Sequence, residues 1–75
     1  MTQEQYTQKR YQLVREFWFL KSKRLYLSAR ARVRKIADLD FQYDGIPREV
    51  TLKKFHYNNL KHLTEQSPAV KPEKI

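Results

Sequence analysis

The first 37 residues of the chain contain neither glycine nor proline, and the only glycine among its 75 residues is Gly45. Folds built from many short strands need frequent tight turns, and those turns depend on residues such as glycine and proline. A long stretch without the two strongest helix breakers instead favours continuous helix. The sequence therefore predicts an all-α fold.

The N-terminal helix is expected to begin near residue 3. Thr2 and Gln5 have the spacing of a capping box, and Glu4 lies in the first turn, where the helix dipole favours an anion. Apolar residues then recur at helical spacing into the thirties. We expect one long helix over this stretch, or two abutting helices with a kink near Ser22.

Two hydrophobic stripes run along this expected helix. The first contains Tyr11, Val14, Trp18, Leu25, Ala29, Val33 and Ile36. The second, on nearly the opposite side, contains Tyr6, Leu13, Phe17, Leu20, Leu27 and Ala31. Either the rest of the chain covers one side and leaves large aromatic residues partly exposed, or a second copy or another protein binds there. The favoured hypothesis is a homodimer or other protein interface formed by Leu13, Phe17, Trp18, Leu20 and Leu27.

Residues 25–43 also fit a different pattern. Apolar and polar residues alternate from Leu25 to Val33, and Leu39, Phe41 and Tyr43 continue a period of two. This pattern is typical of strands, so the alternative fold is a small α-β-β-α arrangement with a hairpin over 25–43. Residues 34–38 contain no recognisable hairpin turn, and the segment is rich in good helix formers, which favours the helix.

The segment 44–47 is the one strong breaker. Gly45 accepts a positive φ, and Pro47 suits the first position of a helix. A shorter C-terminal helix is expected from there to about Gln66, with one face formed by Leu52, Phe55, His56, Asn59, Leu60 and Leu63. The sequence thus predicts a single small helical domain over 1–66 and a disordered tail over 67–75.

The charge distribution is the most informative functional signal. Sixteen Lys and Arg residues stand against eight Asp and Glu residues, so the net charge is +8. The 21 residues between Glu16 and Asp38 contain no acid but seven cations: Lys21, Lys23, Arg24, Arg30, Arg32, Arg34 and Lys35. These cations have no local partners, and their repulsion is relieved when a polyanion binds. The sequence predicts that they bind the phosphates of DNA or RNA.

Two aromatic residues lie near these cations on the helical wheel. Phe19 and Tyr26 either pack in a core or interface, which is the favoured interpretation, or stack on unpaired bases. The acidic residues Asp38, Asp40, Asp44 and Glu49 are expected to neutralise part of the basic helix, or the basic patch of a second subunit.

The turn also suggests a DNA-binding motif. Gly45, Ile46, Pro47 and Arg48, followed by Thr51 and Leu52, resemble the turn and second helix of a helix-turn-helix. The resemblance covers some ten residues, and Phe41 stands where the motif requires a small side chain. It implies that Arg48, Lys53 and Lys54 face the groove of DNA.

Signals for catalysis are nearly absent. His56 and His62 are six residues apart, so their side chains diverge on a helix and do not converge on one metal ion. His56 is expected to lie in the core or an interface. No cysteine is present, and no nucleophile, base or paired carboxylates form a recognisable constellation. We expect no enzyme activity, no cofactor, no metal and no small-molecule substrate.

These observations lead to two functional hypotheses. The first is a small basic regulatory or accessory protein, of the kind found in phages and mobile elements, that binds nucleic acid through an Arg- and Lys-rich helix. The second is an interaction module or inhibitor that docks an aromatic and basic helix on an acidic protein. The longest apolar run, over 17–20, is too short to span a membrane. A cytoplasmic location, with nucleoid association if DNA is bound, is therefore expected.

Overall fold

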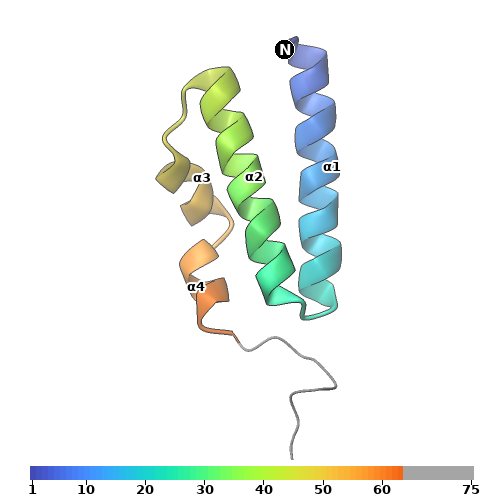
Figure 1. Ribbon diagram of the computed structural model, residues 1–75, viewed down its shortest axis with the longest axis vertical. Helices are drawn as coiled ribbons and strands as arrows, with labels where there is room; N and C mark the ends of the chain where they lie inside the picture. Colours follow the sequence, from blue (N-terminus) through green and yellow to red (C-terminus); the bar gives the residue numbers. More distant parts are fainter. Residues whose placement is uncertain (64–75) are drawn as a thin grey trace, which may run out of the picture.

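The computed structural model describes residues 1–63, which form four helices (Figure 1). Helices α1 (Gln3–Ser22) and α2 (Tyr26–Asp44) lie side by side as an antiparallel hairpin, and α3 (Arg48–Lys54) and α4 (Tyr57–Lys61) return along α2. The described residues contain no strand. The expected all-α fold is confirmed, and the alternative hairpin over 25–43 is wrong, because those residues form α2 and its approach.

Helix α1 begins where the capping signal places it. The backbone N–H of Gln5 donates to the Thr2 hydroxyl at 3.1 Å, and the backbone N–H of Thr2 donates to the Gln5 side chain at 3.0 Å. The two bonds satisfy backbone donors that a helix N-terminus would leave without partners.

The break near Ser22 is a complete reversal of the chain rather than a kink. Arg24 takes the left-handed conformation at φ 60°, and its N–H donates to the Lys21 carbonyl at 3.0 Å. The N–H of Leu25 donates to the Leu20 carbonyl at 2.9 Å. This pair of bonds is the Schellman pattern that ends helices, which usually requires glycine at the left-handed position. An arginine there costs about 1 kcal/mol of backbone strain.

The reversal changes which hydrophobic residues are buried. The two stripes were traced through one continuous helix, but the turn resets the helical phase between α1 and α2. Ala29, Val33 and Ile36 of the first stripe are buried, whereas Tyr11 and Trp18 of the same stripe remain exposed.

The turn after α2 is confirmed. Gly45 takes φ 70°, and its N–H donates to the Phe41 carbonyl at 2.9 Å, which ends α2. The expected C-terminal helix is instead divided into α3 and α4, because His56 takes the left-handed conformation at φ 55°.

The division also corrects the face expected for that helix. His56, Asn59 and Leu63 are exposed, so His56 is not a core residue, and Thr51 is buried in their place. The expected extension to Gln66 and the expected disordered tail over 67–75 lie outside the described residues.

A small hydrophobic core joins the hairpin to α4. Its buried members are Phe17 of α1, Ala29 and Val33 of α2, and Leu60 of α4. The Phe17 ring meets the edge of the Phe55 ring with centroids 5.2 Å apart. Partly buried side chains surround this centre: Leu20, Tyr26, Leu52, Phe55 and Tyr57. Tyr26 thus packs against the core, as the favoured interpretation expects.

A buried carboxylate ties three helices together beyond this core. Asp40 of α2 is only 2% exposed and accepts four hydrogen bonds. Tyr6 donates its hydroxyl proton to Oδ1 at 2.7 Å, and Thr51 donates to Oδ2 at 2.8 Å. Arg10 donates from Nε to Oδ1 at 2.9 Å and from Nη2 to Oδ2 at 3.3 Å. The Tyr6 ring also stacks on Tyr43, with centroids 4.3 Å apart.

These contacts shift the ionisation of the cluster. Burial alone raises the pKa of the Asp40 carboxyl, but hydrogen bonds from Arg10, Tyr6 and Thr51 outweigh burial and hold that pKa below its usual range. Burial and the hydrogen bond to Asp40 raise the pKa of Tyr6 to about 12. The hydrogen bond to Asp40 also raises the pKa of Arg10.

Removing the carboxylate should therefore destabilise the fold strongly. We expect Asp40→Ala to lower the free energy of unfolding by about 3 kcal/mol, because it leaves a guanidinium with no buried partner. Asp38→Ala breaks the exposed ion pair with Arg48 and should change the same quantity by less than about 1 kcal/mol. Urea unfolding followed by circular dichroism measures both, and equal effects would contradict the role given to Asp40.

The cluster should also set how stability responds to acid. The pKa of Asp40 is lower in the folded than in the unfolded protein, so its stabilisation is complete above the unfolded pKa of about 4 and disappears as pH falls through the folded pKa. We expect the Tm of the protein to fall more steeply below about pH 4 than the Tm of Asp40→Asn. Parallel slopes in thermal scans of the two proteins would contradict this expectation.

Candidate nucleic-acid interface

The fold brings two acid-free segments to one end of the molecule. Residues 17–37 contain no acid, and neither do residues 50–63. The first segment forms the end of α1, the turn and the first half of α2, while the second includes α4, which lies beside that half of α2 (Figure 1). We call the region around the turn and α4 the basic end, and its cations are Lys21, Lys23, Arg24, Arg30, Arg34 and Lys61. The two segments also contain Arg32, Lys35, Lys53 and Lys54, which we do not include in it.

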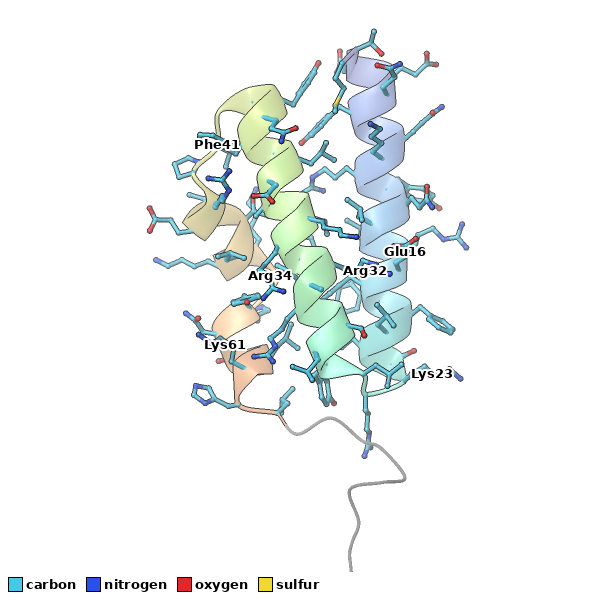
Figure 2. All side chains as sticks on the ribbon, viewed as in Figure 1. Glu16, Lys23, Arg32, Arg34, Phe41 and Lys61 are labelled. Carbon is cyan, nitrogen blue, oxygen red and sulfur yellow. The ribbon has the colours of Figure 1, made fainter. Side chains whose placement is uncertain are left out.

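Labelled side chains mark this end in Figure 2. Lys23, directly after α1, and Lys61 of α4 lie toward the lower end of the molecule. Arg34 lies between α2 and the α3–α4 layer. Lys23, Arg24, Arg34 and Lys61 are exposed. The basic end also contains the N-terminus of α2, which has no acidic residue in its first turn and no side-chain cap. A helix N-terminus carries a partial positive charge, which adds to that of the side chains.

One cation of the predicted set is neutralised within the chain. Arg32 Nε donates to Glu16 Oε1 at 2.7 Å across the hairpin, and Figure 2 shows the two side chains directed toward each other. Gln12 supports the carboxylate with a bond of 3.4 Å. Arg32 is therefore neutralised by a distant partner, which the absence of local partners did not reveal. Its partner was hidden because Glu16 is 16 residues away in the sequence.

Two arginines on α2 face the α3–α4 layer. Arg34 Nη1 donates to the Tyr57 hydroxyl at 3.0 Å, so its guanidinium has a neutral partner and keeps an uncompensated charge. Arg30, one turn earlier, has its Nε shielded from solvent without a hydrogen-bond partner among the described residues. A donor in that state raises the energy of the protein, and a rotation of the guanidinium toward an external oxygen would relieve it.

Two lysines of the set lie over aromatic rings rather than beside acids. Lys21 Nζ is 5.0 Å from the centroid of the Trp18 ring, and Lys23 Nζ is 5.7 Å from that of Phe19. These contacts orient the ammonium groups without cancelling their charge. Lys35 is exposed and lines a groove with Lys9 and Asp38, away from the basic end.

The acidic residues gather at the other end of the molecule. Asp40 binds Arg10 of α1, and Asp38 pairs with Arg48 at the start of α3. Glu4, Asp44 and Glu49 lie at the beginning of α1, the end of α2 and the beginning of α3. Asp38 and Asp40 therefore pair with Arg48 and Arg10 and not with the cations of residues 21–35, and neutralisation of a second subunit stays a prediction.

The predicted protein interface is only partly available. Phe17 is 1% exposed and belongs to the core, so it cannot contact a partner. Leu13 and Leu20 are partly buried, whereas Trp18 and Leu27 are 55% and 58% exposed. Most of the second stripe is therefore covered by the chain itself, and Trp18 and Leu27 remain as candidates for contact with a partner.

Sequence reasoning missed the contribution of α4. Lys61 joins the basic end because the chain folds back along α2, and the absence of acids from residues 50–63 was the signal that was available. The cations that the helix-turn-helix resemblance assigns to the groove, Arg48, Lys53 and Lys54, lie on α3, which is seven residues long. Arg48, the first of them, forms an ion pair with Asp38, and its guanidinium carbon lies 4.5 Å from the centroid of the Phe41 ring.

Other site classes gain no support from the described part of the chain. Within residues 1–63, no three residues of the types His, Cys, Asp and Glu lie together in a way that could hold a metal ion. None of the described helices is both long and apolar enough to cross a bilayer. No protein-family model, no curated protein sequence and no solved structure matches this chain, so its function has to be argued from its own residues.

Proposed function

We propose that the protein binds nucleic acid through its basic end, by neutralising phosphates. The observation that carries this proposal is the separation of charge: two acid-free segments meet at one end, and all but one of the described acids lie at the other. Glu16 is the exception, and it forms an ion pair with Arg32. Closely spaced cations repel one another in the free protein, so a polyanion that releases its own counterions gains affinity there.

The types of side chain at the basic end support the same proposal. Guanidinium groups bind phosphate oxygens through two parallel donors, and Arg30 and Arg34 present such groups one helical turn apart on α2. The exposed lysines of the turn and of α4 add point charges on either side. A regulatory or accessory role, in the cytoplasm, is part of the same proposal.

An acidic protein is the alternative partner for the same end. Carboxylates would also satisfy these cations, but an acidic protein surface lacks the condensed counterions whose release makes nucleic-acid binding steeply dependent on salt. Self-association through Trp18 and Leu27 stays a prediction. A stable dimer interface needs more apolar surface than these two side chains supply on their own.

Removing cations from the basic end should change that salt dependence. We expect the double variant Lys23→Gln, Lys61→Gln to make the slope of log affinity against log salt shallower by about two units on duplex DNA, because two phosphate contacts are lost. Fluorescence anisotropy of labelled DNA, and of RNA in parallel, measures the slope. The helical signal in circular dichroism should stay unchanged.

The matched control removes equal charge from the opposite end. Lys9→Gln combined with Arg48→Gln should leave the slope within about half a unit of the original. Equal losses in the two double variants would show that net charge alone attracts the DNA, which would contradict the assigned surface. If neither DNA nor RNA binds at low salt, the acidic protein partner replaces nucleic acid.

Freeing Arg32 should strengthen binding. We expect Glu16→Gln to tighten binding at low salt and to steepen the slope by up to about one unit, because an arginine next to the basic end loses its internal partner. Glu4→Gln removes the same charge at the far end of α1 and is the control. A Glu16→Gln variant that binds no more tightly than Glu4→Gln would exclude Arg32 from the interface.

A further inference from the structure

The outer face of α1 is exposed and aromatic, and the one acid beside it is neutralised within the chain. Tyr11, Arg15, Trp18 and Phe19 lie on this surface, which we call the aromatic face, and its three rings are 62%, 55% and 59% exposed in chain order. The one acid of this part of the helix, Glu16, is turned toward α2 by its ion pair with Arg32. Three large exposed rings on one helix face form an apolar patch, and such a patch marks a site of interaction.

Each ring of the aromatic face has a cation over it. The guanidinium carbon of Arg15 is 5.6 Å from the centroid of Tyr11, while Lys21 covers Trp18 and Lys23 covers Phe19 at the distances given above. A nucleobase that stacked on one of these rings would carry its phosphate close to the neighbouring cation. Alternation of aromatic rings and cations is the arrangement that binds single-stranded nucleic acid.

A shallow groove of about 780 Å³ runs along this face between Tyr11 and Phe19. Glu16 and Arg32, paired with each other, line one side of it. Gln8 and Gln12 also line it, and their side-chain amides supply both donors and acceptors to the edges of unpaired bases. Arg15 also lines it and supplies a guanidinium. Along the helix the face continues directly into Lys21, Lys23 and the basic end, so a strand that crosses it would meet the phosphate-binding cations next.

Charge complementarity indicates which kind of ligand fits this face. In a two-fold dimer packed on the face, Arg15 at its centre would approach Arg15 of the second copy, and the one acid that lines the groove, Glu16, is already paired with Arg32. A DNA duplex offers phosphates, but its bases are stacked on one another and are not available to the rings. A single strand offers both phosphates and free base faces.

We propose that the aromatic face stacks the bases of a single-stranded nucleic acid whose phosphates are held by the basic end. This inference rests on the proposed function and adds the class of nucleic acid. Trp18 and Phe19 are the stacking residues, and Lys21 and Lys23 bind the adjacent phosphates.

The test compares strands of equal charge with and without bases. Trp18 is the only tryptophan, so its fluorescence reports directly on the proposed contact. The intact protein is titrated with an oligothymidylate and an oligouridylate of about 12 nucleotides, and with an abasic oligonucleotide of the same length. We expect both base-bearing strands to quench Trp18 and to bind more tightly than the abasic strand, and the tighter of the two distinguishes DNA from RNA.

Variants then locate the contact. Trp18→Leu and Phe19→Leu should each lower affinity for the base-bearing strand by about tenfold and leave affinity for the abasic strand unchanged. Phe41→Leu is the matched control, because Phe41 is also an exposed aromatic residue beneath a cation but lies at the acidic end, near the top of Figure 2. Its affinity should match that of the original protein.

The other outcomes overturn the inference in distinct ways. Equal affinity for abasic and base-bearing strands means that only phosphates are bound, so the proposed function stands and the stacking proposal fails. Failure to bind any strand or duplex at low salt removes the proposed function as well. Quenching of Trp18 by anionic phospholipid vesicles but not by strands assigns the face to a membrane surface. A dimer in sedimentation that Phe19→Leu dissociates assigns it to a second copy.

Discussion

The buried carboxylate of Asp40 is the interaction on which the arrangement of the helices depends. It joins Tyr6 and Arg10 of α1 to Thr51 of α3 across α2, so one side chain determines how three helices meet. An ionised group at this depth is tolerated only when its lone pairs are filled, and here hydrogen bonds reach both oxygens. The cluster holds one end of the molecule together by polar contacts, whereas the core around Phe17 holds the other by hydrophobic burial.

The separation of the polar cluster from the hydrophobic core explains why one end of the molecule can remain basic. The hydrophobic core formed by Phe17, Val33 and Leu60 joins α1, α2 and α4, and the ion pair between Glu16 and Arg32 adds a contact between α1 and α2. Apart from Glu16, which pairs with Arg32, no described acid lies in that half, so its cations are not balanced by an equal number of carboxylates. Their mutual repulsion costs stability, which burial of the core offsets. The polar cluster and the cations are thus separated along the molecule, and the charge asymmetry follows.

The start of α1 and the glycine turn were readable from the sequence, but the breaks at Arg24 and His56, with the helix starts that follow them, were not. The capping box at Thr2 and the left-handed Gly45 are local signals, and both occur as expected. Arg24 and His56 adopt the same left-handed conformation without glycine, so no residue type marked these ends. The missed reversal at Arg24 also explains the errors in the two stripes. The burial of Asp40 could not be foreseen, because its partners on α1 lie 30 and 34 residues away.

The basic segment was predictable as a composition, but its electrostatic strength depends on that unforeseen reversal. On one straight helix, the cations from Lys21 to Lys35 would be spread over about 21 Å at 1.5 Å per residue. The hairpin instead folds the end of α1 against the start of α2, and α4 adds Lys61 beside them. Counterion release depends on how many phosphates are neutralised at once, so folding the same charges into a smaller volume favours a polyanion over scattered carboxylates. The strained turn at Arg24 is what produces that density.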